Sequence, residues 1–191
     1  MGYKEEKQRQ LDSRYMRMAR IWAENSYCIR RQVGALIVKD KMIISDGYNG
    51  TPSGFENICE DEAGLTKPYV LHAEANAITK VAKSANNCEG ATLYITASPC
   101  IECSKLIIQA GIKRVVYSDD YHKSEGLDLL RRVGIEIAQI KSRETNRITY
   151  LIYEKEKLYR NAAGGADRDY IRRPTENTRL SGRRRTDRVA R

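Results

Sequence analysis

The sequence predicts an α/β protein with three layers, α/β/α, around a mixed sheet of about five strands. Two observations carry this prediction. Between residues 91 and 140, short runs of branched apolar residues alternate with segments of helical apolar spacing, a pattern typical of parallel strands with helices on both faces of the sheet. Earlier in the chain, two apolar runs separated only by the polar residues 39–41 predict an N-terminal hairpin.

The first predicted helix spans residues 11–25. Its apolar side chains recur at helical spacing, and they are Leu11, Tyr15, Met18, Ala19 and Trp22. We expect this stripe to be the buried face of an amphipathic helix, with Asp12 or Ser13 as its N-terminal cap. Residues 1–10 are polar and are expected either to fray or to begin the helix.

The hairpin follows at residues 33–38 and 42–48, and it leads into the stretch Gly47-Tyr48-Asn49-Gly50. Residues 51–71 combine two prolines and two glycines with several acids and show little periodicity. They therefore predict a long loop. Loops of this length inside a compact domain are usually functional.

The later elements alternate in type. The sequence predicts helices at 72–83, 100–110 and 124–133, and strands at 91–96, 114–117 and 135–140. Gly111 and Gly134 are placed to end two of these helices. A further edge strand at 147–153 and a short helix at 154–161 complete the expected elements.

A chain of 191 residues is long enough for one domain with an extension, and we expect a catalytic domain at 1–160. The formal net charge of +9 is concentrated at the end of the chain, where residues 160–191 hold ten arginines and four acids, a net of +6. The remainder carries only +3, so nucleic-acid binding by the domain is not expected. The extension 161–191 is rich in arginine, poor in apolar residues and expected to be flexible in the free subunit.

The five cysteines are too few and too irregularly spaced to predict a disulfide framework. A reducing cytoplasm is the better interpretation. The first residues after Met1 are mostly charged, and no apolar run approaches the roughly 18 residues needed to span a bilayer. We therefore expect a soluble cytoplasmic protein with no membrane contact.

Two short motifs predict a metal site. The first is His72-Ala73-Glu74. The second is a Pro-Cys-x-x-Cys motif that contains Cys100 and Cys103, and Cys100 lies 28 positions after His72. One imidazole and two thiols suit Zn²⁺, and a site with three protein ligands keeps its fourth position open, as catalytic zinc sites do. This order, H-x-E…P-C-x-x-C, is typical of zinc-dependent nucleobase deaminases, in which the glutamate is the general acid/base and is not a ligand.

The spacing also constrains the geometry. Cys100 and Cys103 are three apart, which places both on one side of a helical turn. His72 and Glu74 are two apart and cannot share a helix face, so His72 must lie at the start of its helix if both side chains are to reach one cleft. Zinc lowers the pKa of bound water to near neutrality, and Glu74 is the expected proton carrier between water, ring nitrogen and departing ammonia.

A structural zinc site is the competing hypothesis, and it needs a fourth protein ligand. His122 is the only other histidine, and the remaining thiols are Cys28, Cys59 and Cys88. Cys28 and Cys59 are the most plausible pair for a second zinc site; the alternative is that both are simply buried small apolar groups. Cys88 is expected at a helix end, without a role.

Beyond these motifs, the sequence resembles the deoxycytidylate (dCMP) deaminases of the zinc-dependent cytidine/deoxycytidylate deaminase superfamily. The resemblance covers about residues 14–140. It rests on the pieces Cys28 to Ala35 (C-I-R-R-Q-V-G-A), Gly47 to Pro52 (G-Y-N-G-T-P), His72 to Ile78 (H-A-E-A-N-A-I), Ser98 to Cys103 (S-P-C-I-E-C), Gly111-Ile112, and Tyr117 through Tyr121-His122. The zinc motif identifies only the superfamily; the G-Y-N-G-T-P piece, the long loop and Tyr121-His122 point to its nucleotide branch.

The resemblance implies deamination of dCMP to dUMP with release of ammonia, which supplies thymidylate synthesis. It implies that Asn49 contacts the sugar and that Arg30 and Tyr121 bind the nucleotide. It also implies activation by dCTP and inhibition by dTTP in a homo-oligomer, with a hexamer favoured. Gly47, Tyr48 and Gly50 are then the effector candidates, and a Mg²⁺ ion accompanying a bound triphosphate is left open.

Two other functions compete with this one. The arginine-rich extension is compatible with a polynucleotide deaminase resembling the tRNA adenosine deaminases, which stack an extruded base on aromatic side chains. Only one Phe (Phe55) and one Trp (Trp22) occur in the chain, and this counts against that hypothesis. The other alternative is a non-catalytic, zinc-stabilised interaction module in which Glu74 is only a surface charge.

Overall fold

A computed structural model describes residues 2–121 and 125–141 of the chain. Its helices are α1 (Tyr3–Ala23), α2 (Ala73–Val81), α3 (Ile101–Gln109) and α4 (Glu125–Arg132). Its strands are β1 (Gly34–Lys39), β2 (Met42–Tyr48), β3 (Thr92–Ala97), β4 (Arg114–Asp119) and β5 (Glu136–Gln139). The predicted strand 147–153, the predicted helix 154–161, His122 and the extension 161–191 lie outside the described residues, and the domain boundary at 160 stays a prediction.

The five strands form one mixed sheet in the order β2-β1-β3-β4-β5. The hairpin pair β1 and β2 is antiparallel, β1 is also antiparallel to β3, and β3, β4 and β5 are parallel. Asp40 and Lys41 form the hairpin turn with φ of 51° and 64°, which suits the right-handed twist of the two strands. The predicted sheet of a hairpin followed by parallel strands is confirmed.

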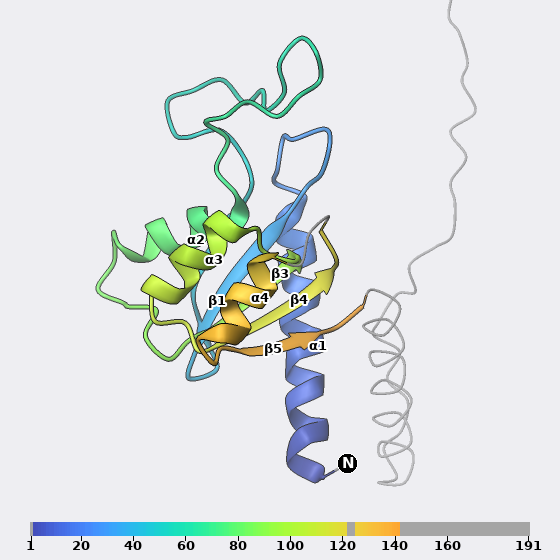
Figure 1. Cartoon of the computed structure of the whole chain (residues 1–191), viewed down its shortest axis with the longest axis vertical. Coiled ribbons are helices and arrows are strands. Elements are labelled where there is room, and N and C mark those ends of the chain that lie inside the picture. Colours follow the sequence, from blue (N-terminus) through green and yellow to red (C-terminus); the bar gives the residue numbers. More distant parts are fainter. Residues whose placement is uncertain (1, 122–124, 142–191) are drawn as a thin grey trace, which may run out of the picture. The chain divides into compact units, whose positions relative to one another are not determined.

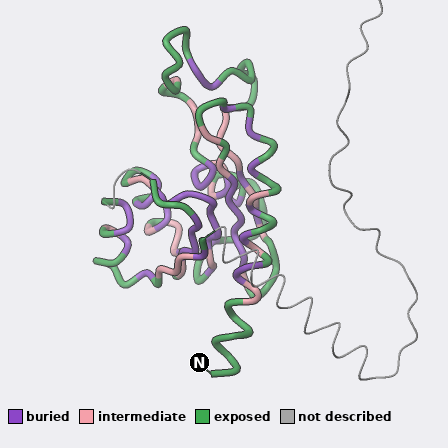
Figure 2. Tube along the Cα trace, turned by 90° about the vertical axis from the view of Figure 1, so that its right-hand side faces the viewer, coloured by how far each residue is buried: buried purple, intermediate pink, exposed green. Residues whose placement is uncertain are grey.

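Helices cover both faces of the sheet (Figure 1). On one face, α2, α3 and α4 pack over side chains such as Ile37, Ile95 and Val115. On the other face, α1 packs over Leu36 and Tyr94. The run V-G-A-L-I-V is apolar throughout because alternate side chains of β1 face opposite, equally covered sides. The three-layer α/β/α prediction is confirmed. In Figure 2 the buried residues fill the middle of the trace, and the helix that starts at the label N is exposed over its first turns.

The first helix begins at Tyr3, which confirms the alternative that residues 1–10 begin the helix, but it corrects the prediction in two respects. Its cap is Gly2, so Asp12 and Ser13 lie inside the helix and are not caps. Its buried apolar face consists of Met16, Ala19 and Ala23, whereas Met18 and Trp22 are exposed.

Close packing explains which face of α1 is buried. Small residues allow the helix to approach β1 until an added Cβ on Gly34 would lie 2.0 Å from the carbonyl oxygen of Ala19. A face carrying Met18 and Trp22 would hold the helix farther from the strand. The predicted apolar stripe is therefore correct at Ala19, which is buried, and wrong at Met18 and Trp22, which are exposed.

The predicted long loop is confirmed for residues 51–71, which contain no helix or strand. Its two ends are tied by the pairing of Gly50 with Leu71, and a second bridge joins Glu60 to Thr66. Within the described ranges, no helix combines the length and the apolar character needed to cross a bilayer.

Cys28 and Cys59 are joined in a disulfide, with 5.1 Å between their Cα atoms. The sequence analysis singled out these two cysteines as a pair, but it predicted either a second zinc site or two buried thiols. The disulfide corrects that prediction. Cys88 is a buried free cysteine in the turn between α2 and β3, not at a helix end as predicted.

Thiol titration tests the disulfide. We expect protein purified without reductant, then denatured in the presence of a chelator, to react through three thiols, those of Cys88, Cys100 and Cys103. Prior reduction should raise the number to five, the total in the chain. Five reactive thiols before reduction would contradict the disulfide.

Candidate active site

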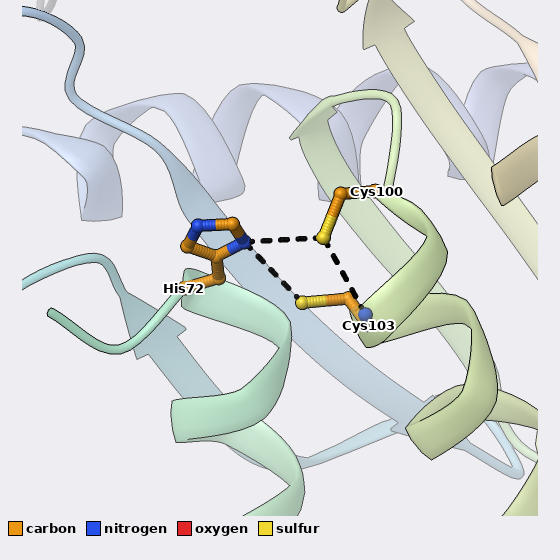
Figure 3. A group of neighbouring side chains, drawn as sticks. All are labelled: His72, Cys100 and Cys103. Carbon is orange, nitrogen blue, oxygen red and sulfur yellow. Dashed lines mark hydrogen bonds between the residues drawn. The ribbon is translucent and has the colours of Figure 1, made fainter. Parts of the chain in front are cut away.

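His72, Cys100 and Cys103 converge at one end of the sheet, where α2 and α3 begin (Figure 3). His72 Nδ1 lies 3.4 Å from the sulfur of Cys100 and 3.4 Å from that of Cys103. Zinc bonded tetrahedrally at ordinary Zn–N and Zn–S lengths would hold such N and S atoms roughly 3.5 Å apart. Among the described residues, this is the one group of three or more potential ligands with its atoms within 4.8 Å of one another. The donor set and its spacing therefore fit zinc.

The start of each helix positions these ligands. His72 is the residue preceding the first turn of α2 and has extended backbone, with φ of −74° and ψ of 157°. Because His72 is not in helical conformation, its ring and the Glu74 side chain need not point to different sides of α2. This agrees with the position predicted for His72 from its spacing to Glu74. Cys100 holds the same position in α3, and its sulfur accepts a hydrogen bond from the Cys103 amide at 3.5 Å.

The surroundings of Cys100 favour its thiolate. Hydrogen bonding from the Cys103 thiol, aided by His72 and by the helix amide, lowers the pKa of Cys100 to about 3, although burial opposes this. The hydrogen bond with Cys100 also raises the pKa of His72. The hydrogen bond between the Cys103 thiol and Cys100, together with burial, raises the pKa of Cys103, so the pair holds one thiolate, and binding of a metal ion would release the proton of Cys103.

Glu74 lies in the first turn of α2 and is almost completely buried, with 3% of its surface exposed. Burial raises the pKa of this carboxyl to about 7, and backbone hydrogen bonding together with the charge of His72 opposes the rise. A carboxyl that can hold or release a proton near neutral pH suits general acid/base chemistry.

Close contact between β2 and α2 supports this turn of the helix. An added Cβ at Gly47 would lie 2.2 Å from the carbonyl oxygen of Ala73, so only glycine permits this approach. Gly47, an effector candidate from the sequence, thus has a packing role beside Glu74.

A cavity of about 170 Å³ opens over the metal ligands. His72, Cys100 and Glu74 lie on its lining, and so do the three residues predicted to contact the nucleotide, Asn49, Arg30 and Tyr121. The fold therefore brings these six predicted residues together, although their distance along the chain reaches 91 positions.

Asn49 also has a structural task in this cavity. Its Oδ1 accepts a hydrogen bond from the Val33 amide at 2.7 Å, and its Nδ2 donates to the Arg31 carbonyl at 2.8 Å. An amide group retains one further donor and one further acceptor site, so these bonds leave it able to contact a ligand.

The sequence did not identify three other residues of the lining, Arg31, Glu60 and Ser98. The Arg31 guanidinium lies 5.4 Å from the centre of the Tyr121 ring, and Ser98 Oγ accepts a hydrogen bond from the Tyr121 amide at 2.7 Å. Arg31 follows Arg30 in the C-I-R-R-Q-V-G-A piece. Its position next to a predicted nucleotide-binding residue could therefore have indicated a role in the same site. Nothing in the sequence distinguishes Glu60 from the other acids of the long loop.

Two of the three effector candidates lie at a different cavity. Tyr48 and Gly50 line a space of about 440 Å³ together with residues of the long loop and of α2, including Lys80 and Lys83. Within the described part of the chain, these two residues do not contribute to the cavity over the metal ligands, and neither does Gly47.

The model of the cytidine and deoxycytidylate deaminase zinc-binding region matches residues 9–119. The deoxycytidylate deaminase of Enterobacteria phage T4 is 33% identical, over 72% of this chain and 94% of that protein. The deoxycytidylate deaminase of Homo sapiens is 41% identical, over 58% of this chain and 66% of that protein.

A solved structure shows the same similarity. The dCMP deaminase of cyanophage S-TIM5, in complex with dCMP and dUMP, is 43% identical, with a TM-score of 0.66 over 73% of this chain and 99% of that one.

Proposed function

The chain belongs to the cytidine and deoxycytidylate deaminase zinc-binding family, and we propose that it hydrolyses dCMP to dUMP with release of ammonia. The observation that carries this proposal is the buried Glu74 in one cavity with two arginines and with His72 and Cys100, two members of the zinc-compatible group. The names of the relatives, and the dCMP and dUMP bound in the cyanophage structure, support the choice of substrate.

Each side chain has a task in this reaction. His72, Cys100 and Cys103 would hold the zinc, which when bound makes water a better nucleophile at neutral pH. Glu74 takes the proton released as water attacks the amino-bearing ring carbon, gives it to the ring nitrogen, and assists departure of the amino group as ammonia. Water supplies the oxygen of dUMP, so the atoms of dCMP and water balance those of dUMP and ammonia.

Other residues of the cavity lining suit the rest of the nucleotide. Asn49 would contact the sugar through the donor and acceptor sites that remain beside its two backbone hydrogen bonds. Arg30 and Arg31 bring positive charge, and a planar guanidinium matches the geometry of a phosphate. Tyr121 lies under Arg31 and offers a ring surface to the ligand.

Regulation is a further proposal. The second cavity combines Tyr48 and Gly50 with two lysines, a suitable chemistry for the triphosphate of dCTP or dTTP. A role in thymidylate supply, a cytoplasmic location, assembly as a homo-oligomer such as a hexamer and a Mg²⁺ ion with the effector remain predictions from the family resemblance.

A substrate panel tests the function. We expect purified, zinc-loaded protein to release ammonia from dCMP, with weaker or no release from deoxycytidine, adenosine, single-stranded DNA and RNA, because dCMP combines a free cytosine base for the zinc-compatible group with a phosphate for the arginines. CMP differs from dCMP only by its 2′-hydroxyl, so its rate measures the selectivity for deoxyribose. Ammonia release and the ultraviolet spectrum of the pyrimidine follow the reaction. Turnover confined to polynucleotides would favour the tRNA deaminase-like alternative, and no turnover at full zinc content would favour the interaction module.

A further inference from the structure

Glu60 is a buried acid in a mostly exposed loop. Its exposed fraction is 9%, and its carboxylate faces the segment between α1 and β1. Oε1 accepts hydrogen bonds from the amides of Ile29 at 3.0 Å and Arg30 at 3.1 Å. The Cys28–Cys59 disulfide joins the same two stretches of chain. The long loop, drawn in teal and green in Figure 1, is thus attached to the segment that follows α1.

The attached segment carries the positive charge of the cavity wall. Arg30 Nη1 donates to Thr66 Oγ1 at 3.3 Å, and Arg31 lies over the ring of Tyr121. Both arginines line the cavity over the metal ligands. Both side chains extend from residues 28–31, so the course of this backbone influences where their guanidinium groups lie.

A carboxylate in a cavity for a phosphate requires a physical reason, because the two negative charges repel. Here Glu60 directs one oxygen at two backbone amides, and a charged acceptor makes such hydrogen bonds stronger than a neutral one does. Its effect on a ligand would then be exerted through the backbone of Arg30.

We propose that Glu60 is a positioning residue for the substrate's phosphate: it fixes the backbone at Ile29 and Arg30, so that the guanidinium groups of Arg30 and Arg31 face the cavity. The inference rests on the proposed function for the identity of the phosphate-bearing substrate as dCMP. It assigns Glu60 to nucleotide affinity and leaves the chemical step to Glu74.

Steady-state kinetics with dCMP test this role. We expect Glu60→Ala to raise KM about tenfold, with kcat within about twofold of the parent value, because two charge-assisted hydrogen bonds are lost away from the reacting atoms. The inhibition constant of inorganic phosphate should rise in parallel. Glu60→Gln keeps an oxygen acceptor and should remain within about threefold of the parent KM.

Glu62→Ala is the matched control, since Glu62 is an exposed acid in the same loop, and its KM should equal that of the parent. If Glu60→Ala does not fold, Glu60→Asp replaces it, because the shorter side chain withdraws the oxygen from both amides. Zinc content and thermal melting show that each variant is intact.

An unchanged KM in Glu60→Ala, or a loss confined to kcat, would overturn the inference. So would a Glu60→Gln variant as impaired as Glu60→Ala, because the charge rather than the backbone contacts would then matter. If the parent protein fails to deaminate dCMP, the proposed function is wrong. Calorimetric binding of inorganic phosphate to the parent and to Glu60→Ala still decides the role of Glu60, and equal affinities would refute it.

Discussion

Replacing Glu74 by glutamine is expected to lower kcat for dCMP deamination by about 10²–10⁴-fold, while the protein keeps its zinc. Glutamine has nearly the same shape as glutamate but cannot accept and return a proton at neutral pH. The three proposed zinc ligands, His72, Cys100 and Cys103, are unchanged in this variant. Single-turnover kinetics and metal analysis of the same preparation would separate the loss of chemistry from the loss of metal.

Glu102→Gln provides the control. Glu102 lies in the first turn of α3, between the two cysteine ligands in sequence, but its side chain is 73% exposed and pairs with Lys105. This variant removes the same charge near the same metal ligands and should retain the parent kcat within about twofold. If Glu74→Gln retained activity at the level of this control, Glu74 would not be the proton carrier.

Replacing Asp12 by alanine is expected to lower the free energy of unfolding by about 3–5 kcal/mol. Asp12 is 2% exposed and accepts two hydrogen bonds from the Arg114 guanidinium, both at 2.8 Å. The Tyr94 hydroxyl also donates to it at 2.7 Å. The substitution leaves a largely buried guanidinium and a buried hydroxyl without this acceptor, so the attachment of α1 to β3 and β4 is weakened.

Denaturant unfolding of Asp128→Ala is the comparison. Asp128 pairs with Arg131 on α4, where both side chains are more than half exposed, and the same change there should cost less than about 1 kcal/mol. Equal losses in the two variants would show that the Asp12–Arg114 pair contributes no more than a surface pair.

Local patterns predicted most of the secondary structure correctly. The hairpin strands 33–38 and 42–48 were located to within a residue, because apolar runs and a short polar turn are local features. The zinc-compatible group of His72, Cys100 and Cys103 was likewise identified from two short motifs. Each motif lies at the start of a helix, so the local backbone already determines how its ligand atoms are arranged.

Patterns failed where the outcome depended on close packing. The helical spacing of apolar residues placed Met18 and Trp22 on the buried face of α1 with Ala19, whereas the close approach at Gly34 favours the face that carries Ala19 and Ala23. Asp12 was taken for a helix cap, since nothing local indicates that Arg114, 102 positions away, supplies its partner.

Sequence alone therefore predicted the α/β class, the zinc-compatible group of His72, Cys100 and Cys103, and Glu74 as the spare carboxylate, because each prediction rests on short motifs and local spacing. The folded chain was needed for the wall of the cavity. Arg31, Glu60 and Ser98 come from three separate segments, and Glu60 is distinguished only by the two amides that its buried oxygen contacts. Such contacts arise from the folding of a long loop without periodicity, and no local pattern encodes them.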